Sequence, residues 1–393
     1  MTQIIETAEQ TLIHTYNRYQ IVLDHGDGVY LYDENGKRYL DCASGIGVFA
    51  LGYQNPYFNE KMKEQLDKLT HCSNLYYNAP ATKAATKLVA ASGMEKVFFT
   101  NSGTEAIEGA VKIAKKYGYL KFGTTDGEII AMRHSFHGRS MGALAVTGQP
   151  KYQEAFGTVI DNIKFAEYNN LDSVKELITD KTVAILFETV QGEGGLYPGT
   201  EEFVKGVREL CDQHDLLMMV DEIQCGMGRT GTMFAYQGFD VVPDVVTSAK
   251  AIGNGFPVGA FMVRGKASDV LVAGDHGSTY GGNPLAGMAV DTVLTIFEQD
   301  KVVEHVKEVA PYFEKVLDEF VAKYDCILER RGKGLMQGLE FKQPVAPVIA
   351  KAQENGLLVI SAGANVLRFL PPLIITKEQM DEMAEILHGC IEK

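Results

Sequence analysis

The amino-acid sequence predicts an α/β fold built around a mostly parallel, buried sheet. The middle of the chain alternates short apolar runs with amphipathic stretches, and the runs cover residues 97–100, 129–132, 183–188, 216–222, 245–250 and 258–263. Helix-like periodicity fills several of the gaps, at residues 104–117, 171–178 and 201–214. Strands that are apolar on both faces are typical of parallel sheets covered by helices on both sides.

The two ends of the chain differ from this middle part. Near the start, Asn35-Gly36 separates two aromatic strand-like stretches and predicts a hairpin. After about residue 285 the pattern predicts helical structure to residue 320, strands near 332–341, a helix at 348–355, a strand at 366–370 and a final helix from Lys377. We therefore expect a large domain over residues 51–288 and a small α+β domain built from residues 1–50 and 289–393.

Composition limits the possible partners. The 393 residues are 46% hydrophobic and 22% charged, as expected for a globular protein with a sizeable core, and the net charge of −14 disfavours nucleic acid and anionic membranes. No apolar run approaches the roughly 20 residues of a membrane span, and the first residues do not resemble a secretion signal. The six cysteines form no CxxC pair and fit reduced thiols. We expect a cytoplasmic protein.

Lys250 is the first candidate for chemistry. It ends an apolar run and precedes the glycine-dense segment AIGNGFPVGA. The carboxyl end of a parallel strand faces the crevice where open α/β sheets bind ligands. Desolvation there lowers the pKa of a lysine and supplies the neutral amine that Schiff-base chemistry requires. The alternative is a lysine that caps the strand and extends to water.

Two further strand ends carry suitable residues. Asp221 ends the run LLMMVDE, and an aspartate in this position can face the ring nitrogen of pyridoxal phosphate. Ser102, Gly103 and Thr104 follow another apolar run and open a helix, whose N-terminus is suited to bind phosphate. An ordinary strand-end aspartate and an ordinary capped helix are the alternatives. Together with Lys250, these residues indicate a pyridoxal phosphate site.

Five segments make a resemblance specific. The segments DEIQCGMGRTG, SAKAIGNGFPVGA, FHGR, QGEGG and GSTYGGNPLA resemble the class III aminotransferases, in particular the acetylornithine-using branch, and the similarity extends over nearly the whole chain. The resemblance implies a fold-type I pyridoxal phosphate-dependent transferase with a mostly parallel seven-stranded sheet. It also implies a homodimer.

The resemblance assigns roles to individual positions. Lys250 would bind the cofactor covalently and move the proton, and Asp221 would keep the pyridine nitrogen protonated. Further cofactor contacts would come from Ser102, Gly103, Thr104, Phe136, Glu222, Ile223, Gln224 and, across the subunit interface, Thr279. Substrate contacts would come from Arg139, Ser278, Glu193, Arg368 and Tyr16.

The implied reaction is transfer of the δ-amino group of N2-acetyl-L-ornithine to 2-oxoglutarate in two half-reactions. The products would be N-acetyl-L-glutamate 5-semialdehyde and L-glutamate, within arginine biosynthesis. Glu193 would pair with Arg368 while the distal amine is bound and release it for glutamate. Succinylornithine, γ-aminobutyrate and ornithine stay open as donors. Ile46 stands where ornithine-using members carry a tyrosine, which disfavours ornithine.

Three other motifs suggest different functions. Residues 226–231 match the GxGxxG pattern of NAD-dependent dehydrogenases, but no amphipathic helix follows them. Residues 138–142 match the GxSxG pattern of serine hydrolases, with Asp221 and His276 as possible partners, but Ser140 lies eight residues beyond the preceding strand. The pairs His134/His137 and Cys211/His214 lack further ligands, so we expect no metal site.

Overall fold

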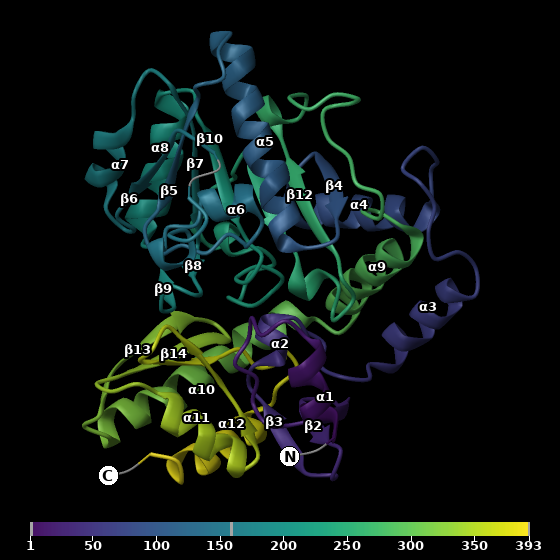
Figure 1. The fold of residues 1–393 in the computed structure, drawn as a ribbon, viewed down its shortest axis with the longest axis vertical. Coiled ribbons are helices and arrows are strands. Elements are labelled where there is room, and N and C mark those ends of the chain that lie inside the picture. Colours follow the sequence, from purple (N-terminus) through teal and green to yellow (C-terminus); the bar gives the residue numbers. More distant parts are fainter. Residues whose placement is uncertain (1–2, 158–159, 392–393) are drawn as a thin grey trace.

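A computed structural model describes residues 3–157 and 160–391, and its largest layer is a seven-stranded sheet (Figure 1). In spatial order the strands are β4 (Lys96–Thr100), β12 (Gly259–Val263), β11 (Val245–Ser248), β10 (Leu217–Asp221), β7 (Thr182–Glu188), β5 (Glu128–Met132) and β6 (Ile163–Ala166). The strands β11, β10, β7, β5 and β6 are parallel, and β12 is antiparallel to both of its neighbours. The predicted mostly parallel α/β sheet is confirmed.

Helices cover both faces of this sheet. On one face α5 (Gly103–Phe122) packs against β12, β11 and β7; on the other, α8 (Glu201–Gln213) packs against β10 and β7, and α7 (Leu171–Leu177) against β6. Successive residues of β7 point to opposite faces, so Leu186 packs with α5 residues and Phe187 with α8 residues. Further helices surround these layers: α3 (Pro56–Leu66), α4 (Ala79–Ser92), α6 (Met141–Ala145) and α9 (Pro284–Gln299).

Two smaller sheets lie in the other half of the molecule, and the first of them combines strands from both ends of the chain (Figure 1). The first contains β1 (Leu23–Asp27), β2 (Tyr30–Asp33), β3 (Arg38–Asp41) and β15 (Leu357–Leu358). The second contains β13 (Ile327–Lys333), β14 (Met336–Phe341), β17 (Val366–Phe369) and β16 (Ile360–Ala362). Helices α10 (Val302–Lys323), α11 (Ala346–Glu354) and α12 (Lys377–His388) accompany them. Since β15 pairs in parallel with β3, residues more than 300 positions apart hold this half together.

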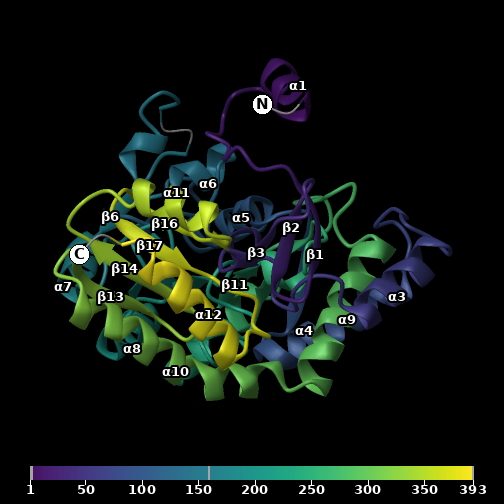
Figure 2. The same ribbon diagram turned by 90° about the horizontal axis from the view of Figure 1, so that it is seen from below.

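The remaining elements are a short hairpin, a one-turn helix and the N-terminal helix. A short hairpin, β8 (Val190–Gln191) and β9 (Tyr197–Pro198), follows β7, and α2 (Ser44–Gly47) follows β3. Helix α1 (Gln3–Thr11) buries no residue and projects away from the body in Figure 2. Within residues 3–157 and 160–391, none of the helices combines the length and apolar character that a membrane crossing requires.

The predicted elements are present, and several further elements were not predicted. The Asn35-Gly36 hairpin is formed by β2 and β3, and six strands of the central sheet lie at the apolar runs. The elements that were not predicted include α1, α3, α4, β1, β8, β9, β15 and β16. Strand β6 was not predicted, because its four residues include a lysine and form too short an apolar run. The helical stretch after residue 285 is two helices, α9 and α10, because Lys301 adopts a left-handed conformation with φ 52° between them.

Gly109 tests the packing of α5 on the sheet. A Cβ atom at this position would overlap the ring of Phe261, which is stacked on Phe98 at 5.1 Å. We expect Gly109→Ala to lower the free energy of unfolding by about 1–3 kcal/mol, as overpacking typically does. Urea denaturation measures the change. Gly277→Ala is the matched control because a Cβ atom added there would have no neighbouring atom within 4 Å, and an equal loss in both variants would contradict the packing argument.

Candidate active site

A cavity of about 480 Å³ opens at the carboxyl edge of the seven-stranded sheet. Parallel strands end together at this edge, which is where α/β sheets bind ligands. The predicted residues that line the cavity are Ser102, Gly103, Thr104, Phe136, Arg139, Glu193, Asp221, Ile223, Gln224 and Lys250. Segments far apart in sequence therefore meet in one site.

Lys250 lies just beyond the end of β11, in a left-handed conformation with φ 51°. Its amine forms no hydrogen bond or ion pair within the described part of the chain. Enclosure by the cavity walls lowers its pKa, although the nearby charge of Glu193 opposes the shift. A lysine with a lowered pKa and an unoccupied amine is suited to nucleophilic attack on a carbonyl carbon.

Asp221 is held rigidly at the end of β10. One carboxylate oxygen accepts hydrogen bonds from the Ile223 backbone N–H at 3.0 Å and the Thr247 hydroxyl at 3.2 Å. The other lies 2.7 Å from Nδ1 of His137. Burial opposes protonation of His137, but Asp221 outweighs it and raises the pKa of the ring. The carboxylate is thus fixed in place and faces the cavity.

Glu188 is a second buried carboxylate beside Asp221, and sequence reasoning missed it. The register of β7 and β10 pairs Glu188 with Asp221 directly. Its oxygens accept hydrogen bonds from the backbone N–H groups of Phe136 at 3.1 Å and Gly192 at 3.3 Å. Burial raises the pKa of Glu188 to about 7. The sequence signal was available, because Glu188 ends an apolar run as Asp221 does.

Arg368 lies on β17, in the smaller half of the molecule, and contacts two residues of the cavity lining without lining the cavity itself. Its guanidinium donates to Glu193 at 2.6 Å, to Oε1 of Gln224 at 3.3 Å and to the Ser361 carbonyl at 3.1 Å. Arg368 is 3% exposed, so its guanidinium is shielded from water, whereas the Glu193 side chain is 25% exposed. Burial opposes ionisation of Glu193, but Arg368 and Lys250 outweigh it and keep the pKa of Glu193 below its ordinary value.

The N-terminus of α5 forms the opposite wall. Ser102 caps the helix by accepting from the Glu105 N–H at 3.3 Å, which leaves the first N–H groups of the helix available to an anion. The Thr104 hydroxyl lies 2.7 Å from the Ser140 hydroxyl. Gly103 is required for close packing, since a Cβ atom there would lie 2.9 Å from Ile223. This wall can hold a phosphate group.

Besides Arg368, four predicted residues lie outside the cavity of the single chain. Glu222 points into the protein, where its carboxylate accepts from the N–H groups of Ala235 at 2.8 Å and Tyr236 at 3.0 Å, and burial raises its pKa to about 7. Tyr16 is 70% exposed. Thr279 is exposed, and Ser278 contacts the cavity residue Asn101 at 3.2 Å without lining the cavity itself. The sheet edge does not bring these four to the ligand space.

The competing motifs have structural explanations. The Ser140 hydroxyl donates to Glu108 at 2.5 Å, while His276 lies beside Lys112 at 3.1 Å, so no Ser–His–Asp triad forms among these residues. Arg229 of the GMGRTG segment is buried and donates to the Leu335 carbonyl at 3.1 Å. The segment continues as turns rather than the helix that binds a dinucleotide.

The Glu193–Arg368 pair predicts a pH dependence of stability. A carboxylate whose pKa is lowered by folding stabilises the protein above its ordinary pKa of 4.5, and this contribution is lost as the pH falls through the lowered value. We expect Glu193→Gln to destabilise the cofactor-free protein most at pH 6–7 and progressively less below about pH 4.5. Urea denaturation at each pH measures the difference. Glu34→Gln, on the exposed hairpin turn, is the matched control for the loss of a carboxylate. If the loss of stability caused by Glu193→Gln grew as the pH falls, the stabilising role of the Glu193–Arg368 pair would be refuted.

Comparison with known proteins identifies the family. The family model "Aminotransferase class-III" matches residues 12–391. The chain is 46% identical over 382 residues to an acetylornithine aminotransferase of Clostridium acetobutylicum, covering 97% of this chain and 99% of that protein. A solved N-acetylornithine aminotransferase from Stenotrophomonas maltophilia aligns with TM-score 0.84 and 35% identity over 98% of both chains.

A second solved structure carries the cofactor. An ornithine aminotransferase from Toxoplasma gondii, described with partial occupancy of PLP at its active site, aligns with TM-score 0.94 and 29% identity over 98% of this chain and 93% of that one. Family match, sequence identity and fold agree over nearly the full chain. The chain therefore belongs to the class III aminotransferases, a family of pyridoxal phosphate-dependent transaminases.

Proposed function

We propose that this chain transfers the δ-amino group of N2-acetyl-L-ornithine to 2-oxoglutarate. The observation that carries the proposal is the coexistence of two different arginines beside one unpaired lysine. Arg368 is neutralised by Glu193, and Arg139 lines the same cavity with no carboxylate partner among the described residues. The relatives named acetylornithine aminotransferase support the choice of donor.

The cavity residues fit pyridoxal phosphate. The cofactor, when bound, supplies a conjugated ring that carries the amino group from donor to acceptor. The α5 N-terminus with Ser102 and Thr104 would hold its phosphate, and the fixed carboxylate of Asp221 would face its ring nitrogen. The unpaired Lys250 amine would bind it covalently. Phe136 and Ile223 would enclose the ring.

Once the substrate amine has displaced it from the cofactor, the Lys250 amine would act as the base and acid of the reaction. Its lowered pKa makes the neutral amine available near neutral pH, as a group that accepts and returns a proton requires. Asp221 would hold a positive ring nitrogen, because its carboxylate is oriented by the N–H of Ile223 and by His137.

Glu193 and Arg368 would adapt the pocket to two substrates. While the distal amine of acetylornithine reacts, no substrate carboxylate lies at the reacting carbon, and Glu193 neutralises Arg368 as observed. When glutamate or 2-oxoglutarate binds, Arg368 would pair with the carboxylate next to the reacting carbon. An arginine left buried without a partner would be costly, so the pair serves both half-reactions.

A second copy of the chain would complete the site. We propose a homodimer in which Thr279 of one subunit reaches the phosphate of the other, since Thr279 is exposed at the end of a loop. Large aromatic side chains are also exposed in this region. Tyr280, next to Thr279 in sequence, is 61% exposed, and Tyr77 is 104% exposed. We further propose that the protein acts in the cytoplasm, as an enzyme of arginine biosynthesis.

A panel of amine donors tests the proposed donor. We expect acetylornithine to convert the bound cofactor faster than succinylornithine, ornithine or γ-aminobutyrate, measured by the change in visible absorbance in single-turnover experiments. Lys250→Ala should abolish turnover and the borohydride-dependent attachment of cofactor to the chain. If γ-aminobutyrate or ornithine reacted as fast as acetylornithine, the proposed donor would be wrong.

Glu193→Gln tests the substrate switch. The variant leaves Arg368 without its charged partner, so the distal-amine half-reaction should slow by roughly ten-fold or more, whereas the glutamate half-reaction should change little. Stopped-flow absorbance resolves the two half-reactions. Equal slowing of both would remove the switching role and leave Glu193 as a general structural element of the pocket.

A further inference from the structure

Aromatic rings, rather than a carboxylate, hold the guanidinium group of Arg139. Its Cζ atom lies 4.1 Å from the centroid of the Tyr152 ring and 5.5 Å from that of Phe136. The two rings meet edge to face, with centroids 5.8 Å apart and an interplanar angle of 77°. Arg139 forms no hydrogen bond or ion pair with the described residues, so all its N–H donors stay available.

Tyr152 itself is placed by its neighbours. It ends the short 3₁₀ turn Pro150–Tyr152, and its N–H donates to the Gln149 carbonyl at 3.0 Å. The Gln149 amide donates to the Ser135 carbonyl at 3.1 Å, next to Phe136. The Gln153 amide donates to carbonyls at the end of α6, including that of Leu144 at 2.8 Å. These bonds tie the turn to the cavity wall.

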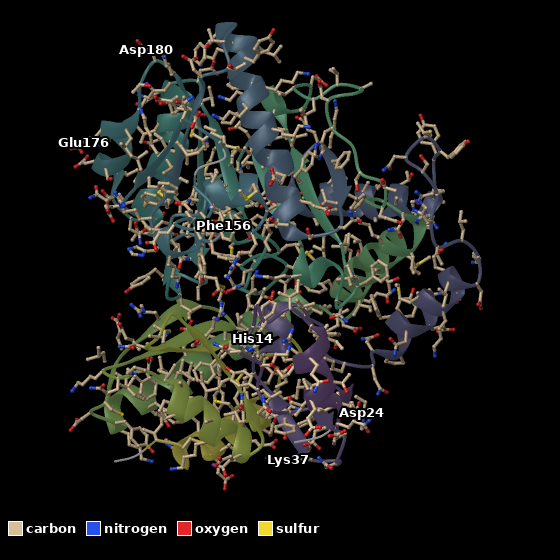
Figure 3. All side chains as sticks on the ribbon, viewed as in Figure 1. His14, Asp24, Lys37, Phe156, Glu176 and Asp180 are labelled. Atoms are coloured by element: carbon tan, nitrogen blue, oxygen red, sulfur yellow. The ribbon has the colours of Figure 1, made fainter. Side chains whose placement is uncertain are left out.

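The segment beyond the turn leads to the surface. Phe156 is 64% exposed and is labelled in Figure 3 on the half of the molecule that contains the large sheet. Tyr152 is only partly exposed, and it does not line the cavity, whereas Arg139 and Phe136 do. The Tyr152 ring therefore supports the arginine from outside the cavity lining.

We infer that Tyr152 is a positioning residue that fixes Arg139 to bind the substrate carboxylate remote from the reacting amine; this inference depends on the proposed function. An arginine loses side-chain freedom when it binds a carboxylate, and stacking on a ring removes part of that cost beforehand. A protein carboxylate would do the same but would compete with the substrate. A ring face holds the cation and leaves its donors free.

A pair of donors that differ only in the carboxylate isolates this effect. N2-acetyl-L-ornithine is compared with N-acetyl-1,4-diaminobutane, and the ratio of their kcat/KM values is measured in the wild type, Tyr152→Phe and Tyr152→Leu. We expect a high ratio in the wild type, the same ratio in Tyr152→Phe, and a ratio about ten-fold lower in Tyr152→Leu. Because each ratio is taken on one enzyme sample, the amount of folded protein cancels.

Three further variants separate the effect of stacking from effects of charge and of general damage to the site. Lys151→Gln removes an ammonium group 4.8 Å from the same ring and should keep the wild-type ratio. Adding Tyr152→Leu to Arg139→Ala should lower the ratio no further than Arg139→Ala alone. A wild-type ratio near one would overturn the proposed recognition of the carboxylate, and the inference with it. If the wild-type ratio is high and Tyr152→Leu keeps that ratio, the inference is overturned and the proposed function is intact. The same holds if Lys151→Gln lowers the ratio as much as Tyr152→Leu does.

Discussion

The fixed carboxylate of Asp221 at the end of β10 is the interaction on which the rest of the site depends. Its neighbours in the sheet are set by register, with Glu188 on one side and Thr247 on the other. Two buried carboxylates side by side repel each other if both are ionised, so their environments must differ. Among the described residues, the Glu188 carboxylate accepts hydrogen bonds from backbone N–H groups alone, whereas Asp221 also contacts His137. The Asp221 carboxylate is therefore the one that is held in place by a second side chain and can face a cationic ligand atom.

The two arginines of the cavity are held by different physical means. Arg368 is paired with Glu193 and accessible only when that pair opens. Arg139 is stacked on Tyr152 and can bind an anion without displacing any partner. This difference suits one constant and one alternating carboxylate in the two half-reactions. It also shows how an acidic protein, with net charge −14, can bind anions, because local side chains and a helix N-terminus determine the potential inside the pocket.

The smaller half of the molecule is held together by contacts between its own two chain segments and is joined to the larger half by Arg229. Arg229 of the large half donates to the Leu335 carbonyl, and the Leu370 N–H donates to the Cys42 carbonyl at 2.7 Å. The Ser44 hydroxyl donates to the Leu370 carbonyl at 2.6 Å, within a turn whose residues have positive φ. Leu370 lies two residues beyond Arg368, just after the end of β17. The position of Arg368 thus depends on contacts between both chain ends.

The sequence by itself determined six of the seven strands of the sheet, since each apolar run became a strand. It also determined the chemistry at the strand ends, since Lys250, Asp221 and the α5 N-terminus all line one cavity. These features are local: a strand needs an apolar run, and a helix N-terminus needs a cap. Only the tertiary structure decided which residues face the cavity. Glu222 follows Asp221 in sequence, yet it points inward, because successive residues at a strand end point to opposite sides. The contacts of His137, Glu188 and Tyr152 likewise depend on strand register and loop packing. His137 and Glu188 lie 84 and 33 positions from Asp221 in the sequence, and Tyr152 lies 13 positions from Arg139. No local sequence pattern predicts contacts over such separations.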